Sequence, residues 1–415
     1  MISIPYIKDF FDVVKKTSID DVVDRLCYFF TTLMFVIFAL MTGSKQLFGE
    51  PIECIMPPEF PDSWVRYARQ YCYVSSTYFV PFDKTWNDVE RQNHTVEGYY
   101  QWVPFILVAQ AILMYLPHLT WKRAQSYQTI NFEHVVTQAE NLRYVVSEKR
   151  QEGIHDIVQY IQHRLSYQGT NKKHLSYAGF GTKSTFFHMM SKVFTIGVIL
   201  MQLIFMNQYF GRGHDNYWGF TMVYNALTNV YWEESGVFPR VTFCDFNQPA
   251  LGTENTRTVQ CVLMVNMLNE KIFVAAWLWL AALLVICISN LIYSAVVLYT
   301  PQFRRTIARK YLRPLVNYGS ISASTSSYTT SLYDNSKIAA FADETLGADG
   351  VHLFQFITNH AGALIASQIC CALYDALNFP EGHPRLETPF GPAGNADSTY
   401  GNGYGGETEP VKAAL

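Results

Sequence analysis

Four long stretches without a charged side chain are the feature that most constrains the fold. Each is at least 19 residues long, and they cover Leu26–Ser44, Gly98–Trp121, Val193–Gly211 and Ile272–Phe303. A helix that crosses a hydrocarbon core of ~30 Å needs about 20 mainly apolar residues, whereas a helix of a soluble protein normally turns a charged face to water. The sequence therefore predicts an all-α membrane protein with four transmembrane helices.

The composition agrees with this interpretation. Only 16% of the residues are charged, 15% are aromatic, and the formal net charge is −3. A soluble globular chain carries about 25% charged residues, so very apolar blocks must alternate here with ordinary polar loops. The small net charge argues against a nucleic-acid partner, and the apolar content argues against a chain that is disordered throughout.

Two further uncharged windows, Asn216–Trp232 and Val351–Tyr374, are too polar for a span. The first contains three asparagines and two threonines, and the second contains two histidines and is interrupted at Asn359–Gly362. Polar groups in the middle of a bilayer are costly without partners. We expect both windows to form amphipathic segments outside the bilayer, which keeps the number of spans at four.

The distribution of basic residues between the loops predicts the orientation. Residues 122–192 hold ten Lys and Arg against five acids, and residues 304–313 hold five against none. Residues 45–97 hold five against eight acids, and residues 212–271 hold four against six. Because basic residues near span ends stay in the cytoplasm, the two acidic loops are the expected extracellular loops and both termini are inside. The glycosylation sequon at Asn93 then falls in the first extracellular loop.

Four of the eight cysteines lie in the expected extracellular loops, two in each. Cysteines in even numbers in an oxidising compartment predict disulfides. Cys54 follows the first uncharged stretch by ten residues, and Cys261 precedes Lys271, the charge before the fourth stretch, by ten. This similar height favours a Cys54–Cys261 bridge, with Cys72–Cys244 pairing farther out; a separate bridge within each loop is the alternative. The spans and the inner tail hold Cys27, Cys287, Cys370 and Cys371.

The sequence contains no convincing catalytic, cofactor-binding or metal-binding pattern. Gly179–Thr185 is like a phosphate loop at first sight, but Thr182 separates the glycine from Lys183 and the earlier glycine is missing. His155 and His163 have no carboxylate or cysteine at metal-ligand spacing, so we expect them at the surface. The spans of ion-coupled pumps usually contain Asp, Glu, Lys or Arg, and none of the four stretches does. We therefore expect neither an enzyme nor an ion-coupled transporter.

The first 25 residues predict a short amphipathic helix followed by the start of the first span. The apolar side has helical spacing and consists of Ile7, Phe10, Phe11 and Val14, and the polar side consists of Lys8, Asp9, Asp12, Lys15 and Lys16. Ser18 and Asp21 resemble a capping box that opens the first span. This segment has no signal-peptide pattern, so the first span is the expected insertion signal. The helix could lie on the inner membrane surface or fold back into a pore.

Three motifs resemble those of innexins, the invertebrate gap-junction proteins. Tyr99-Tyr100-Gln101-Trp102-Val103-Pro104, at the outer end of the second span, matches the signature of that family. Phe238–Phe246 is similar to the innexin stretch around the first cysteine of the second outer loop, and Asp343–Val351 is similar to the segment that opens the innexin cytoplasmic helical domain. The likeness covers residues 10–375. Connexins share the layout but place three cysteines in each outer loop, so they do not fit.

The signature also has a physical interpretation. Tyr99, Tyr100 and Trp102 are amphipathic aromatic residues of the kind found at membrane–water interfaces. Pro104 lacks a backbone donor and can kink the second span, provided that neighbouring groups satisfy the freed carbonyl. We expect this motif to anchor the span rather than to bind a ligand.

The innexin resemblance implies a gap-junction channel subunit at the plasma membrane that passes ions and small metabolites and needs no cofactor. It implies a homo- or hetero-oligomeric ring larger than six, with eight subunits expected, which docks with a ring in the apposed cell. Residues 122–192 and 304–378 would build a cytoplasmic helical domain, and the Gly/Pro-rich residues 379–415 are expected to be disordered. The amino-terminal helix would enter the pore, and its pore-lining candidates are Ile2, Ile4, Lys8, Asp9, Asp12, Lys15 and Lys16.

Two alternatives to a docked channel are consistent with these features. One is an undocked hemichannel that releases small molecules such as ATP, as the related pannexins do. The other, from a different class, is a four-span adhesion protein of the claudin or tetraspanin kind. The claudin arrangement of Trp and paired cysteines and the tetraspanin Cys-Cys-Gly are both missing, which disfavours the adhesion alternative.

Overall fold

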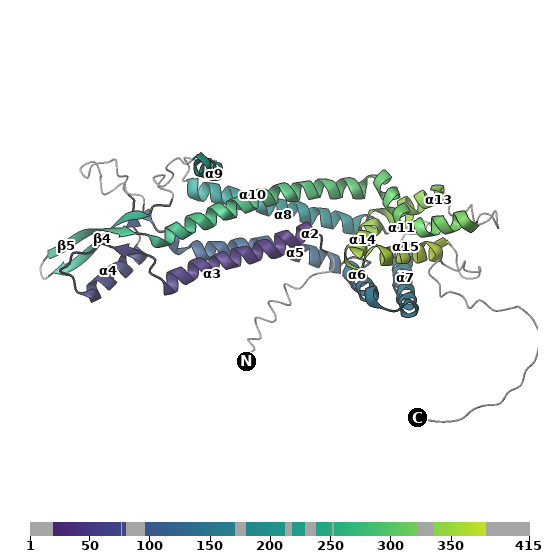
Figure 1. Ribbon diagram of the computed structural model, residues 1–415, viewed down its shortest axis with the longest axis horizontal. Helices are drawn as coiled ribbons and strands as arrows, with labels where there is room; N and C mark the ends of the chain where they lie inside the picture. The colour runs from purple at the N-terminus through teal and green to yellow at the C-terminus, as the bar shows by residue number, and fades with distance from the viewer. Residues whose placement is uncertain are drawn as a thin grey trace, which may run out of the picture.

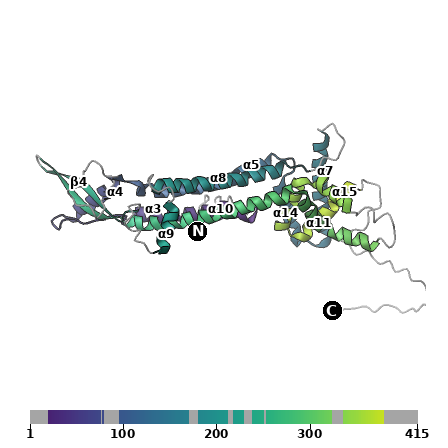
Figure 2. The same cartoon turned by 90° about the horizontal axis from the view of Figure 1, so that it is seen from above.

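The computed structural model describes residues 20–75, 77–79, 96–170, 180–211, 218–228, 238–250, 253–322 and 335–378. Within them the chain is elongated and has three zones along its long axis. A β-sheet lies at one end, four long helices run through the middle, and shorter helices gather at the other end (Figures 1 and 2). We name the sheet end the outer end and the opposite end the inner end, after the orientation that the sequence predicts. The amino-terminal pore-lining candidates, Asn93 and the tail from residue 379 lie outside the described residues.

Four of the described helices are long and apolar enough to cross a membrane. The first runs through α2 (Val22–Arg25), the π-helical turn η1 (Leu26–Thr31) and α3 (Thr32–Phe48), and the others are α5 (Val103–Ser126), α8 (Lys183–Gly211) and α10 (Met264–Tyr299). Their facing side chains form one apolar core that includes Phe35, Leu107, Ile199 and Phe273. At most 39% of the most apolar window of each helix is buried within the chain, so lipid or other subunits must cover the rest.

Two of these helices begin well before the uncharged stretches that predict them. α8 begins at Lys183, ten residues before Val193, and α10 begins at Met264, eight residues before Ile272. The reason is that a helix ends where its backbone hydrogen bonds end, whereas an uncharged stretch ends at the first ionised side chain. The stretches therefore locate the spans but underestimate the helices that contain them.

The inner end of α10 is set by a proline. The fourth uncharged stretch continues to Phe303, but the helix ends at Tyr299, and Thr300 takes extended backbone angles (φ −80°, ψ 121°). Proline disfavours the helical conformation in the residue before it, and Pro301 then begins a new helix, α11 (Pro301–Ser322). The chain thus leaves the fourth span and turns into the inner helices at a single residue.

The two outer loops build a sheet that an all-α prediction does not include. The strands pair antiparallel in the order β1-β5-β4-β2-β3. The elements are β1 (Glu53–Cys54), α4 (Asp62–Ser75), β2 (Thr77–Tyr78), β3 (Val96–Glu97), β4 (Val241–Ala250) and β5 (Thr253–Val262). From Val241 to Phe246 burial alternates between half-buried and buried side chains. This period of two is the sequence signal for a strand, so the all-α prediction was incomplete at the outer end.

The window at Asn216–Trp232 contains one described helix, α9 (Trp218–Thr228). Its 11 residues correspond to about 17 Å, which is too short to cross a bilayer. α9 packs closely on α10, because the ring of Trp277 occupies the space where a side chain at Gly219 would lie. Phe220 and Tyr224 are exposed, although the Phe220 ring also packs edge-on against Trp277 at 4.9 Å.

The inner zone is a compact group of helices around its own apolar core. It contains α6 (Phe132–Asn141), η5 (Leu142–Tyr144), α7 (Ser147–Thr170), α11, α13 (Asn335–Ala340), η7 (Phe341–Leu346), α14 (Gly347–His360) and α15 (Ala363–Asn378). α14 and α15 account for the uncharged window at Val351–Tyr374, and Gly362 separates them with a φ of +100°. α14 is buried on almost all sides, so this window is apolar because it forms the centre of a helical core. α14 is therefore not the amphipathic helix that the sequence predicts.

Asp375 on α15 makes the stability of this inner zone depend on pH. Burial raises the pKa of Asp375 from 3.8 to about 6. Above pH 6 the folded protein holds a desolvated carboxylate, and this cost disappears below about pH 4, where the folded and unfolded forms are both protonated. Asp375→Asn should therefore raise stability by about 2–3 kcal/mol near pH 7.5 and have little effect near pH 3. Thermal melting of the solubilised protein at both pH values measures this, and an equal gain at both would contradict it.

Candidate functional site

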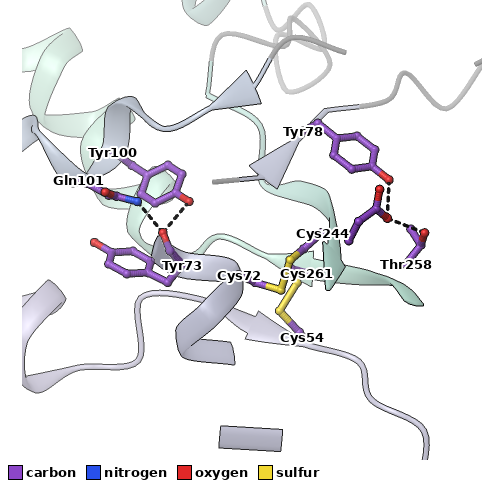
Figure 3. Close-up of a disulfide and its surroundings, with 10 residues drawn as sticks. Cys54, Cys72, Tyr73, Tyr78, Tyr100, Gln101, Cys244, Thr258 and Cys261 are labelled. Carbon is purple, nitrogen blue, oxygen red and sulfur yellow. Dashed lines mark hydrogen bonds between the residues drawn. A yellow bond between two sulfur atoms is a disulfide. The ribbon is translucent and has the colours of Figure 1, made fainter. Parts of the chain in front are cut away.

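Two disulfides join the first outer loop to the second. Cys54 on β1 stands directly opposite Cys261 on β5 in the sheet, and the two are bonded. Cys72 on α4 is bonded to Cys244 on β4 (Figure 3). Both bridges connect positions far apart in the chain, with separations of 207 and 172 residues. These are the pairs that the loop spacing favours over a bridge within each loop.

The two bridges are close neighbours in the outer sheet. The Sγ atoms of Cys54, Cys72 and Cys261 lie within 4.8 Å of one another. In the sheet, Cys261 stands opposite Thr242, so Cys244 is only two residues farther along β4. The Cys72–Cys244 bridge therefore lies farther from the spans than Cys54–Cys261, as expected, but only by two residues of strand. These sulfur atoms cannot hold a metal ion, since each is in a disulfide.

The signature at residues 99–104 fastens the bridged helix α4 to the outer ends of two spans. Tyr100 is fully buried, and its hydroxyl donates to the carbonyl oxygen of Tyr73 at 3.1 Å. The Gln101 amide donates to the same oxygen at 2.6 Å (Figure 3). On the other side, the Gln46 amide at the end of α3 donates to the Tyr100 carbonyl at 2.7 Å. Since Tyr73 adjoins Cys72, the motif positions one half of a disulfide.

The aromatic residues of the signature take different places from one another. Trp102 is 62% exposed, which fits a side chain that faces lipid or another subunit. Tyr99 packs its ring edge-on against Tyr209, Phe210 and Phe238 at 6.1–6.4 Å, so it joins the second span to the third and to the second loop. The prediction of anchoring therefore describes the motif well, but Tyr100 anchors to protein and not to the membrane interface.

Pro104 does not kink the second span. It lies in the first turn of α5, where the backbone N–H has no partner within the helix in any case. Proline is favoured there because its fixed φ suits the start of a helix. The proline inside α5 is Pro117, whose carbonyl accepts hydrogen bonds from Thr120 and from Ser191 of α8. The expectation of a kink at Pro104 was wrong for this reason.

A second constellation lies at the inner end of the spans. Lys192 Nζ on α8 lies 3.1 Å from Asp24 Oδ1 and 3.5 Å from Asp21 Oδ2. His188 Nε2, one turn away, lies 3.0 Å from Asp24 Oδ2. The side chains of His188 and Lys192 are 4% and 5% exposed. A buried charge is tolerated only with close partners, so we treat Asp21, Asp24, His188 and Lys192 as one unit, the inner ion cluster.

Asp20, next to the inner ion cluster, reaches the second span. Its carboxylate accepts a hydrogen bond of 2.7 Å from the Tyr28 hydroxyl and lies 3.5 Å from His118 Nδ1. The rings of Tyr28 and His118 stack at 3.9 Å. The first described residues of the chain are therefore held against α5 and α8, which fixes where the preceding amino-terminal segment meets the spans.

The stretch at Asp343–Val351 connects the inner helices to the third span. Asp349 accepts hydrogen bonds from the backbone N–H groups of Ser184 at 3.1 Å and Thr185 at 2.7 Å, so it caps the first turn of α8. The Asp349 N–H in turn donates to the Gly181 carbonyl at 3.1 Å. Gly347 has a φ of +58° and passes so close to Gly181 that a side chain would press on its carbonyl oxygen. The motif therefore holds the first turn of the helix that forms the third span.

His352, one turn beyond Asp349, completes this junction. Its ring stacks on the ring of His188 at 4.6 Å, and both lie against Phe356. Burial lowers the pKa of His352 well below its usual value, so this ring is uncharged at neutral pH. The inner ion cluster therefore contacts the inner helices through an aromatic stack in which the ring of His352 is uncharged.

The sequence patterns point to the bridged cysteines and to the two motifs at residues 99–104 and 343–351. They do not point to the inner ion cluster, because Lys192 borders an uncharged stretch and falls within the predicted loop. A usable signal was present, since His188 and Lys192 lie four apart and share one helix face. His155 and His163 lie exposed on α7, as expected.

Together the described residues define a four-span membrane protein. Disulfides and strand pairing join its two outer loops in one sheet, and its inner helices hold the start of the third span. The family model described as Innexin matches residues 20–377. The chain belongs to the innexin family. It is 34% identical to Innexin-3 of Caenorhabditis elegans over 382 residues, which is 90% of this chain and 88% of the relative. It is 31% identical to Innexin unc-9 of the same organism over 367 residues, 86% of this chain and 92% of the relative.

Proposed function

We propose that this chain is the subunit of a gap-junction channel through which ions and small metabolites diffuse between adjoining cells. Membership of the innexin family supports this function. The observation that carries it is the outer sheet, in which two disulfides bond both loops together beyond the ends of four spans (Figure 3). A surface that is already rigid loses little conformational entropy when it docks. Docking of two such surfaces is what a channel between two membranes requires.

We further propose the arrangement of the subunits. Several copies form a ring, with eight suggested by the innexin resemblance, and the outer sheets face a second ring in the apposed plasma membrane. Large apolar side chains on the spans are exposed in the single chain, such as Leu40, Phe105 and Ile112 at 58–68%. Lipid and neighbouring subunits would cover them. The excess of basic residues at 122–192 and 304–313 supports an orientation with both termini in the cytoplasm.

Recording from paired cells tests the channel function. Two cells that both express the chain should develop a junctional conductance that passes small dyes, and an expressing cell beside a bare cell should not. Dye uptake or ATP release from single expressing cells without junctional current would favour the hemichannel alternative. Normal surface expression with no conductance in paired or single membranes would contradict a channel and favour the adhesion alternative.

The amino-terminal segment is proposed to line the pore, with Ile2, Ile4 and the charged residues up to Lys16 as candidates. Asp9 and Asp12 lie three residues apart, so a helix places them on one side. A ring repeats each charge around the axis, and charges at a constriction set the local concentration of ions. The anchoring of Asp20 at the inner ends of the spans supports an entry at that side.

Neutralising these two carboxylates gives a prediction on selectivity. Asp9→Asn with Asp12→Asn should shift the reversal potential of single channels toward anion preference, because the ring loses negative charge. Lys8→Gln is the matched control of opposite sign and should shift selectivity toward cations. Unchanged conductance and reversal potential in assembled channels would remove the amino terminus from the pore and leave the first span as its lining.

A further inference from the structure

Two free cysteines are in contact where the first span packs against the fourth. Cys27 on η1 and Cys287 on α10 place their Sγ atoms 3.2 Å apart, and the two residues are 3% and 6% exposed. They lie 260 positions apart in the chain. A disulfide needs a sulfur–sulfur distance of about 2.05 Å, so these thiols are in contact but not bonded. Bonding them requires an approach of about 1 Å and an oxidant that takes two electrons.

A second contact fixes the register of this pair. The indole N–H of Trp279 on α10 donates to the Thr31 hydroxyl at 2.9 Å, and this hydroxyl donates to the Leu26 carbonyl at 3.0 Å. These bonds hold both ends of η1, the π-helical turn that contains Cys27. Single π-helical turns within α-helices are uncommon and occur frequently at functional sites. The irregular turn of the first span is therefore held against the fourth span at two levels.

We propose that Cys27 and Cys287 form a redox-sensitive dithiol whose oxidation bonds the first span to the fourth and changes the conductance of the channel. The conductance part rests on the proposed channel function. At rest the thiols stay reduced, because disulfides on the cytoplasmic side are usually transient and serve as sensors. The inner end of the same span carries Asp20, Asp21 and Asp24, which contact α5 and α8, so a bond that shifts η1 also acts on these contacts.

Hydrogen peroxide, a small uncharged oxidant, balances the reaction. The thiolate of one cysteine attacks the oxygen–oxygen bond and becomes a sulfenic acid, and the hydroxide that leaves takes up the thiol proton to form water. The second thiol then attacks the sulfenic sulfur, the sulfur–sulfur bond forms, and a second water leaves. Two thiols and one peroxide give one disulfide and two waters, so the pair loses two electrons and peroxide gains them.

Other cysteines of the chain serve as matched controls. Cys370 and Cys371 are also buried cysteines without a disulfide, but they lie in the core of the inner helices and not in the core of the spans that contains Cys27 and Cys287. Cys370→Ser therefore tests whether any response comes from another buried thiol. The bridged outer cysteines are already oxidised, so peroxide leaves them unchanged.

The experiment treats intact paired cells that express the full chain with hydrogen peroxide, blocks free thiols with N-ethylmaleimide, and maps peptides without reduction. We expect a linked peptide containing Cys27 and Cys287, and a shift in junctional conductance that grows with it. The linked peptide and the conductance shift should both occur in Cys370→Ser and be absent from Cys27→Ser and Cys287→Ser. Before oxidation, the Cys27→Ser and Cys287→Ser channels should conduct like the unmodified chain.

Two outcomes would overturn the proposal. One is the absence of the linked peptide, and the other is a linked peptide with unchanged conductance or with an equal shift in Cys27→Ser. A chain without conductance before oxidation would instead contradict the proposed channel function, and the peptide map would still report on the dithiol.

Discussion

Cells that express Cys72→Ser on both sides of a contact are expected to lose junctional conductance. The substitution removes one of two adjacent bridges and leaves Cys244 without its partner in the core of the outer sheet. Removal of a native disulfide typically costs about 2–5 kcal/mol. The loss falls on the surface proposed to dock, where Tyr73 next to Cys72 also holds the signature residues Tyr100 and Gln101. Serine at Cys54, Cys244 or Cys261 should have the same effect.

Paired-cell recording with surface labelling measures this result. Cys370→Ser is the control, because it changes a buried cysteine of the inner helices and should leave coupling unchanged. Full conductance in the Cys72→Ser channel would show that docking does not depend on this bridge. Peptide mapping without reduction tests the pairing itself, and a peptide that links Cys54 to Cys72 would contradict the pairing described above.

Lys192→Met is expected to destabilise the folded subunit strongly. The side chain of Lys192 is 5% exposed and lies within 3.5 Å of Asp21 and Asp24, so methionine leaves those carboxylates without their cation. Breaking a buried ion pair from one side costs about 3–5 kcal/mol. We expect the lower part of that range, because His188 still reaches Asp24 at 3.0 Å. The yield and melting temperature of the solubilised protein report the loss.

Two further variants separate this effect from a general intolerance of methionine. Lys183 lies on the same helix, but its side chain is exposed, so Lys183→Met should change the stability little. The double variant Lys192→Met with Asp24→Asn should recover much of the lost stability, because it removes the unpaired charge as well as its partner. A double variant no more stable than Lys192→Met alone would show that the Asp24–Lys192 pair is not the source of the effect.

The sequence predicts the middle zone of the molecule well, because the thickness of a bilayer sets one simple requirement for a span. Uncharged stretches therefore located all four long helices, although α8 and α10 extend beyond their stretches through charged residues. Cysteine spacing favoured the pairs found in the outer sheet for a related reason, since the distance along the chain from a span limits the height of a residue.

Other features depend on contacts that no local pattern contains. Asp24 and Lys192 are 168 positions apart, and each taken alone reads as an ordinary charge beside a span. Asp349 caps a helix that begins 166 positions before it, so its role appears only when α14 is placed against α8. The outer sheet likewise depends on pairing between loops, and its strands β1, β2 and β3 are only two residues long.

The position of the bridges also constrains the order of events during synthesis. Cys54 and Cys72 leave the ribosome before their partners, which follow 207 and 172 residues later. At a translation rate of ~5–20 residues per second, the first pair of thiols waits about 10–40 s, and in the proposed orientation it waits in the oxidising lumen. During this interval each of the two thiols has the other as its one possible partner within the first loop. A Cys54–Cys72 bond formed at this stage would have to be reopened by thiol–disulfide exchange before the native pairs can form.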